Sequence, residues 1–124
     1  MSPPRVLVTE DDEDTRELIE LLLTSEGFEV VTTDVPAKAL GLAITEQFDL
    51  FILDNWMSDS SGLDLCRSLR TFDTKTPILF YSGAALDSDK KDALECGAQA
   101  YIVKPGNLDE LVAEAARLVR DRES

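Results

Sequence analysis

The chain has 124 residues, 44% of them hydrophobic and 30% charged, a composition typical of one folded domain and not of a disordered segment. Its formal net charge of −13 disfavours direct binding to nucleic acid or to anionic lipid, because both need clustered Lys and Arg side chains. It contains no histidine, which excludes histidine general bases, Ser–His triads and most zinc sites.

The N-terminal part of the chain begins with a strand-like pattern. Arg5–Thr9 and Glu29–Thr33 are β-branched runs typical of strands. Apolar residues at helical spacing between them predict a first helix, which Gly27 would end in a left-handed conformation. The expected core-facing residues of this helix are Leu18, Ile19, Leu22 and Leu23.

A second helix is expected to begin at Pro36, because proline suits the first turn of a helix. The third strand is predicted at Leu50–Leu53, and a third helix follows Gly62 with Leu65 and Leu69 facing inward. The expected core-facing residues of the second helix are Leu40, Ala43 and Ile44.

The C-terminal part repeats the alternation. The fourth and fifth strands, Ile78–Tyr81 and Tyr101–Val103, flank a weaker helical pattern over residues 87–96 that Gly97 closes. Asn107 and Glu110 resemble a capping box for a fifth helix. The apolar stripe of that helix consists of Leu108, Leu111, Val112, Ala115, Leu118 and Val119.

This order of elements is (βα)₅. The near-continuous apolar character of three of the strands indicates burial on both faces, as in a parallel sheet. Parallel strands joined by right-handed crossovers predict a doubly wound, flavodoxin-like α/β fold in which residues 1–124 form one domain. No run of apolar residues is long enough to span a membrane and the N-terminus lacks a signal-peptide core, so we expect a cytoplasmic protein.

The two cysteines, Cys66 and Cys96, lie far apart in the sequence without a C-x-x-C pattern. We expect both to be small buried or half-buried thiols.

Carboxylates follow two of the predicted strands. Asp54 ends the third strand, and Glu10 and Asp11 directly follow the first. Ligands of open parallel sheets bind beyond the carboxyl ends of the strands, and in a five-stranded sheet of order 2-1-3-4-5 the first and third strands are neighbours. Carboxylates ~4 Å apart repel by roughly 4 kcal/mol per pair. Oxygen ligands without histidine favour a hard cation such as Mg²⁺, so we expect a cation site.

The next acidic residues, Asp12, Glu13 and Asp14, have a simpler interpretation. Acidic side chains at the start of a helix complement its dipole, and one of them can cap it. On position alone, a structural role of this kind is also an alternative for the cluster at the strand ends.

Two further strand ends bring polar groups to the same edge. The fourth strand finishes in FYSGA, which places the Ser82 hydroxyl there, and the fifth finishes in YIVKPG, which places Lys104 there. Alone, each would be an ordinary turn serine or a solvated lysine. With a cation, the two side chains could neutralise and hydrogen-bond a phosphoryl group carried by Asp54.

At these positions the chain resembles the receiver domain of bacterial two-component response regulators, including the chemotaxis regulator, which has this strand order. The motifs that carry the resemblance are VLVTEDDEDTRELIELLL, LFILDNWMSDSSGLDL, PILFYSGA and GAQAYIVKP, in that order. They cover nearly the whole chain.

The resemblance implies a phosphoacceptor site that uses Mg²⁺. Asp54 matches the aspartate that takes a phosphoryl group from the histidine of a sensor kinase. Glu10 and Asp11 match the acidic pair that holds Mg²⁺, with the backbone carbonyl of Trp56 as a further ligand. A sensor histidine kinase or a histidine phosphotransfer protein is therefore the implied partner. The domain would be a signalling module and not an enzyme in the turnover sense.

The resemblance also implies a switch. Ser82 matches the hydroxyl residue that moves to a phosphoryl oxygen, and Lys104 matches the lysine that pairs with another. Tyr101 matches the aromatic residue that rotates inward as the hydroxyl moves, and the bond between Lys104 and Pro105 is usually cis in the family. The face of the fourth helix, fifth strand and fifth helix would then change shape for a downstream protein or effector domain. A homodimer through that face is compatible with the sequence.

Four positions depart from the family pattern. Glu10 stands where Asp is commoner, Ser58 replaces a common proline, and Gly106 replaces a frequent phenylalanine. Trp56 is bulky beside Asp54, and we expect it to slow the attack of water on a phosphorylated Asp54.

Two other functions are compatible with parts of the sequence. A receiver-like interaction module that is not controlled by phosphorylation would not need the full set of polar residues at the strand ends. A Mg²⁺-dependent phosphohydrolase of the haloacid dehalogenase type would carry a second Asp where Trp56 stands. The sequence identifies neither the kinase nor whether the receiver stands alone or belongs to a longer regulator.

Overall fold

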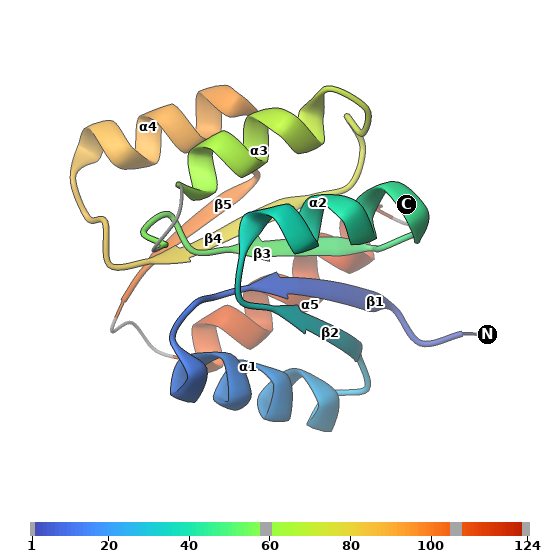
Figure 1. The fold of residues 1–124 in the computed structure, drawn as a ribbon. Helices are drawn as coiled ribbons and strands as arrows, with labels where there is room; N and C mark the ends of the chain where they lie inside the picture. Colours follow the sequence, from blue (N-terminus) through green and yellow to red (C-terminus); the bar gives the residue numbers. More distant parts are fainter. Residues whose placement is uncertain (1, 58–60, 105–107, 123–124) are drawn as a thin grey trace.

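Five strands alternate with five helices in the computed structural model, which describes residues 2–57, 61–104 and 108–122 (Figure 1). The elements are β1 Arg5–Thr9, α1 Glu13–Ser25, β2 Glu29–Thr33, α2 Pro36–Thr45, β3 Leu50–Leu53, α3 Gly62–Arg70, β4 Ile78–Ser82, α4 Asp87–Cys96, β5 Ala100–Val103 and α5 Leu108–Arg122.

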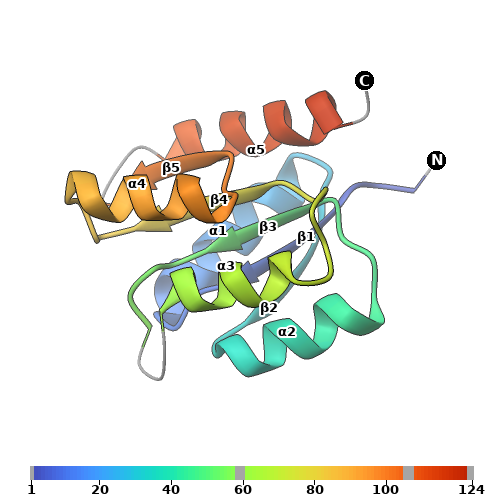
Figure 2. The same ribbon diagram turned by 90° about the horizontal axis from the view of Figure 1, so that it is seen from above.

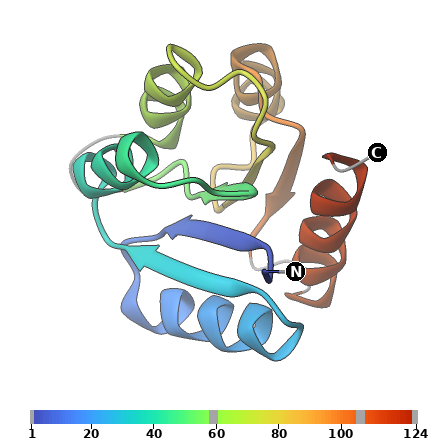
Figure 3. The same cartoon turned by 90° about the vertical axis from the view of Figure 1, so that its right-hand side faces the viewer.

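The strands form one parallel sheet of order β2-β1-β3-β4-β5. Helices α1 and α5 cover one face, and α2, α3 and α4 cover the other (Figures 1 and 3). All the strands point to the same edge of the sheet (Figure 2). The expected doubly wound, flavodoxin-like fold is therefore confirmed.

Two strands are one residue longer than predicted. The pairing of β4 with β5 includes Ser82 opposite Val103 and Leu79 opposite Ala100. Ladder hydrogen bonds thus extend the sheet beyond the apolar runs from which the strands were predicted. The extension makes Ser82 the last residue of β4, at the carboxyl edge.

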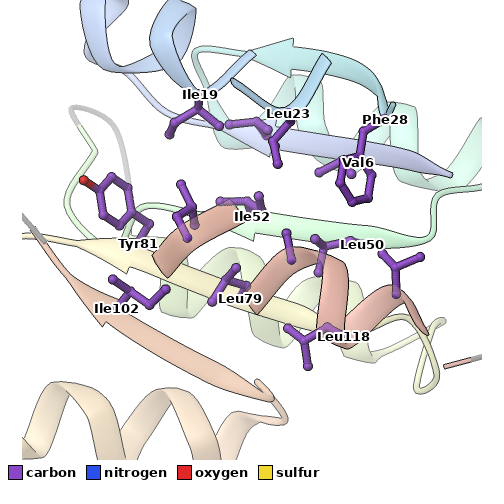
Figure 4. Close-up of a cluster of buried hydrophobic side chains, with 14 residues drawn as sticks. Val6, Ile19, Leu23, Phe28, Leu50, Ile52, Leu79, Tyr81, Ile102 and Leu118 are labelled. Carbon is purple, nitrogen blue, oxygen red and sulfur yellow. The ribbon is translucent and has the colours of Figure 1, made fainter. Parts of the chain in front are cut away.

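Each face of the sheet has its own hydrophobic core. The core under α1 and α5 is made by alternate residues of four strands and by the apolar stripes of the two helices (Figure 4). The core under α2, α3 and α4 is made by the other residues of these strands and by buried apolar residues of the three helices. Because successive strand residues point to opposite faces, strands covered on both sides read as continuous apolar runs.

Two residues expected to face the core are exposed. Leu18 is 42% exposed and Ile44 is 65% exposed. Each lies five positions from the most buried residue of its helix, Leu23 in α1 and Ala39 in α2, which is about 140° around the helix axis. The apolar faces predicted for these two helices were therefore too wide, and the prediction that Leu18 and Ile44 face the core is wrong.

The predicted helix ends are largely confirmed. Gly27, after α1, and Gly97, after α4, have positive φ of 94° and 115°, which suits residues without a side chain. The capping box predicted at Asn107 lies outside the described residues. Among the described residues, the structure has no helix of the length and hydropathy that crossing a bilayer requires.

Candidate functional site

The register of the sheet brings Glu10 and Asp54 to one point. Thr9 of β1 pairs with Leu53 of β3, so the residues that follow each of them leave the sheet side by side. Backbone hydrogen bonds continue past the strands, because the N–H of Asp54 donates to the carbonyl of Thr9 at 3.1 Å and that of Glu10 to the carbonyl of Thr33 at 3.1 Å. Both acidic side chains are buried, with 2% and 4% of their surfaces exposed.

Asp11 completes a group of three carboxylates. One oxygen from each of Glu10, Asp11 and Asp54 lies within 4.8 Å of the others. A set made only of carboxylate oxygens suits a hard divalent cation. The three residues thus fit the divalent metal site expected from the sequence.

Lys104, which directly follows β5, reaches the same carboxylates. Its Nζ lies 2.5 Å from Glu10 Oε1 and 3.0 Å from Asp54 Oδ2. Its backbone N–H donates to the carbonyl of Ser82 at 2.8 Å, which aligns the residue with the end of β4. The ammonium also lies 5.5 Å from the ring centre of Tyr81, whose hydroxyl end is visible at the left of Figure 4. Lys104 is therefore the cationic partner of two buried carboxyl groups.

Burial and charge shift the ionisation of this group. Burial raises the pKa of Glu10 to about 7; the neighbouring Asp54 adds to the rise, and the hydrogen bond from Lys104 opposes it. Burial lowers the pKa of Lys104, but its bonds with the two carboxylates outweigh this and raise the pKa overall. Lys104 thus stays charged at neutral pH, whereas Glu10 is partly protonated.

The raised pKa of Glu10 predicts pH-dependent binding of a divalent cation. A cation must displace the proton of Glu10, so we expect the affinity for Mg²⁺ to fall by up to roughly tenfold per unit as the pH drops below about 7. Titration with Mg²⁺ between about pH 8 and pH 6, followed by Trp fluorescence, measures this. In the control variant Glu10→Gln, binding should be weaker and should lose this pH dependence. Wild-type affinity that is constant over this range would contradict the prediction.

The remaining acidic residues of this loop have the structural role expected for them. Asp12 is the N-cap of α1, because its carboxylate accepts from the backbone N–H of Thr15 at 2.9 Å. Glu13 and Asp14 are exposed in the first turn of that helix. The backbone N–H of Asp12 also donates to Glu10 Oε2 at 3.1 Å, which fixes the Glu10 side chain.

Ser82, the last residue of β4, and Tyr101, within β5, both contact the residue Ala84. The buried Ser82 Oγ accepts from the backbone N–H of Ala84 at 3.1 Å, and the Tyr101 hydroxyl donates to the carbonyl of Ala84 at 2.6 Å. The Tyr101 ring stacks on Phe80, with 5.4 Å between ring centres and 8° between planes. Burial raises the pKa of Tyr101. The two predicted switch residues therefore both form hydrogen bonds with the backbone of Ala84.

Trp56 lies in the loop after β3, two residues beyond Asp54. Its backbone N–H donates to Asp54 Oδ1 at 3.1 Å, whereas its side chain is 64% exposed. The edge of the ring lies against Gly83, where an added Cβ would come within 3.4 Å of it. The role of the Trp56 carbonyl as a metal ligand stays a prediction. The expectations for Ser58, Pro105 and Gly106 concern residues outside those described.

Two structural residues of the site were not predicted. Asn55 is buried beside Asp54, and its Oδ1 accepts from the backbone N–H of Leu63 at 3.1 Å, which ties the start of α3 to the loop. Gly62 packs so closely that an added Cβ would collide with the backbone carbonyl of Asp54. A polar residue directly after the strand-end Asp54 was the available signal for Asn55.

Comparisons with known proteins agree with this geometry. The profile of the family described as the response regulator receiver domain matches residues 6–116. The chain is 40% identical over 116 residues to the cell cycle transcriptional regulator CtrA of Caulobacter vibrioides and 42% identical to the cell cycle response regulator CtrA of Brucella ovis. Both matches cover 94% of this chain and 50% of the relative, so the chain spans about half the length of these curated relatives.

Solved structures share the fold over nearly the whole chain. The response regulator TrrA of Thermotoga maritima, in complex with Mg²⁺ and BeF, is 31% identical with a TM-score of 0.83, and the match covers 93% of this chain and 98% of TrrA. A CheY-like receiver domain protein of Methanospirillum hungatei is 25% identical with a TM-score of 0.94, and the match covers 98% of each chain.

Proposed function

This chain belongs to the response regulator receiver domain family of two-component signalling, and we propose that Asp54 is its phosphoacceptor. The observation that carries the proposal is the position of Asp54: a buried carboxylate at the carboxyl end of β3, with one oxygen 3.0 Å from Lys104 Nζ and two further acidic side chains beside it. Burial of a charge without a partner would be costly. The grouping of this carboxylate with a lysine and two further acidic side chains therefore indicates a functional site.

The proposed reaction transfers a phosphoryl group from a histidine to Asp54. An Asp54 carboxylate oxygen attacks the phosphorus, the P–O bond forms as the P–N bond to the histidine breaks, and the histidine nitrogen keeps the electron pair. Glu10, Asp11 and Asp54 would hold Mg²⁺, with the Trp56 carbonyl as a further ligand. When bound, Mg²⁺ neutralises charge on the phosphoryl oxygens. The complex of TrrA with Mg²⁺ and BeF supports this assignment.

Two other side chains would recognise the transferred group. Lys104 is already within hydrogen-bond distance of Asp54 and would pair with a phosphoryl oxygen. Ser82 lies at the next strand end, and its hydroxyl would turn from Ala84 N–H towards another oxygen. Loss of that bond loosens the loop whose Ala84 carbonyl holds Tyr101, so the signal would reach the face of α4, β5 and α5.

The partners follow from this chemistry. We infer that a sensor histidine kinase or a histidine phosphotransfer protein supplies the phosphoryl group, and that a downstream protein or effector domain reads the α4-β5-α5 face. The module, residues 1–124, would act in the cytoplasm as a switch and not as an enzyme in the turnover sense. A homodimer through the same face stays a prediction.

The single tryptophan offers a direct test of the proposed function. Trp56 adjoins Asp54, so its fluorescence should change when Mg²⁺ is added and again when beryllofluoride is added to the Mg²⁺-loaded chain. Acetyl phosphate with Mg²⁺ should add one phosphoryl group per chain by mass. A chain that binds Mg²⁺ but gains no phosphate would instead favour an interaction module that is not controlled by phosphorylation.

Trp56 should also control how long the phosphoryl group survives. Its ring lies against Gly83, just after the end of β4, and from there it would restrict the approach of water to phosphorylated Asp54. We expect Trp56→Ala to shorten the phosphoryl lifetime by roughly three- to tenfold, measured by loss of phosphorylated chain after acetyl phosphate is removed. Phe72→Ala, at an exposed aromatic residue just after α3, is the control and should leave the lifetime unchanged. An equal or longer lifetime in Trp56→Ala would refute this role.

A further inference from the structure

The fold brings the two cysteines together although 29 residues separate them in the sequence. Cys66 lies on α3 and Cys96 is the last residue of α4, and these helices pack against each other on one face of the sheet (Figure 3). Cys66 Sγ lies 3.9 Å from the carbonyl oxygen of Cys96, and Cys96 Sγ lies 4.0 Å from the carbonyl oxygen of Leu63. Each sulfur therefore lies against the backbone of the opposite helix.

The two thiols differ in accessibility. Cys66 is fully buried, whereas Cys96 is half-buried and lines a surface cavity of about 400 Å³ between α3 and α4. Arg67 and Arg70 of α3 and Asp92 and Glu95 of α4 also line this cavity. The cavity is wide enough to admit a small oxidant to Cys96.

We propose that Cys66 and Cys96 form a dithiol site that a hydroperoxide such as hydrogen peroxide oxidises to a disulfide between α3 and α4, with Cys96 reacting first. The site is separate from the carboxylates at the strand ends and does not depend on the phosphoacceptor role of Asp54.

The chemistry takes two steps. The Cys96 thiolate attacks one oxygen of hydrogen peroxide, the O–O bond breaks, and a sulfenic acid forms as hydroxide leaves and is protonated to water. The Cys66 sulfur then attacks the Cys96 sulfur, and the S–S bond forms as the S–O bond breaks. The departing hydroxide takes the Cys66 proton and leaves as a second water. Two thiols lose two electrons in total, and the peroxide gains them.

The environment of Cys66 explains why Cys96 would react first. Burial raises the pKa of Cys66 to about 12, and a hydrogen bond with the Cys96 side chain adds to the rise. A thiol held in its protonated form reacts slowly with peroxide, but Cys66 lies close to Cys96, with its Sγ 3.9 Å from the Cys96 carbonyl oxygen. We therefore expect the sulfenic acid on Cys96 to live long enough to be trapped.

The test uses the reduced, purified chain and hydrogen peroxide. We expect both free thiols to be lost in the monomer and recovered with dithiothreitol, and peptide mapping without reductant to join the peptide of Cys66 to that of Cys96. In Cys66→Ala, dimedone should trap a sulfenic acid on Cys96. In Cys96→Ser, Cys66 should react with hydrogen peroxide at least roughly tenfold more slowly than Cys96 does in Cys66→Ala.

Three results would overturn the proposal. They are retention of both thiols in the wild type, disulfides formed only between two chains, and equal peroxide reactivity of Cys66 in Cys96→Ser and of Cys96 in Cys66→Ala. The first two measurements use the wild-type chain, so they do not depend on the folding of a variant.

Discussion

Asp54→Asn should abolish phosphoryl uptake. The amide that replaces the carboxylate is nearly isosteric but is not a nucleophile towards phosphorus, so we expect no phosphorylated chain after incubation with acetyl phosphate and Mg²⁺. The separation of phosphorylated from unmodified chain by mass or by phosphate-affinity electrophoresis measures this. The variant should still bind Mg²⁺ through Glu10 and Asp11, roughly tenfold more weakly because one carboxylate charge is lost.

A matched control tests whether the loss of a carboxylate elsewhere on the chain has the same effect. Asp64→Asn removes a carboxylate from the exposed first turn of α3, where it pairs with Arg67. This variant should gain phosphate at the wild-type rate. If Asp54→Asn became phosphorylated as the wild type does, another residue would be the acceptor and the assignment of Asp54 would be lost.

The sequence predicted the positions at the carboxyl edge because strand ends are easy to locate. Apolar runs buried on both faces end abruptly at Asp54 and at Ser82, and parallel pairing places such ends at one edge whatever the details of packing. The same argument placed Glu10 and Lys104, and the structure joins them at 2.5 Å. Their roles in phosphoryl transfer stay predictions.

The details that the sequence did not predict depend on packing between elements. Leu18 is apolar and lies beside the buried face of α1. Its exposure depends on how that helix packs against the sheet, which the sequence pattern does not give. The approach of Cys66 to Cys96 depends on how α3 and α4 pack, which no short-range pattern encodes. Asn55 acts through a hydrogen bond to Leu63, in a loop without periodicity.

Replacement of Lys104 by methionine should destabilise the chain when no divalent cation is present. Lys104 is the counter-ion of Glu10 and Asp54, both buried, and its side chain is only 22% exposed. Loss of one partner from a buried ion pair usually costs more than loss of a surface pair, and we expect a decrease of about 2 kcal/mol in the free energy of unfolding. Protonation of Glu10 limits the cost, since its pKa is already raised to about 7.

The pH dependence of this loss has a definite sign. A carboxyl group whose pKa is higher in the folded than in the unfolded chain destabilises the fold progressively as the pH rises from the unfolded value towards the folded one. Without Lys104 the pKa of Glu10 should rise further, so the loss caused by Lys104→Met should be smaller near pH 5 than near pH 8. Urea unfolding in EDTA at these two pH values measures the difference.

Mg²⁺ should restore much of the lost stability, because it takes over the neutralisation of the same carboxylates. Lys38→Met is the matched control: Lys38 is a surface lysine paired with Asp34, and we expect its loss to change stability by less than about 0.5 kcal/mol with or without Mg²⁺. If Lys104→Met were as stable as the wild type in EDTA, or equally destabilised with and without Mg²⁺, Lys104 could not be the residue that compensates these charges. The alternative would then be that protonation of Glu10 alone relieves the repulsion between Glu10 and Asp54.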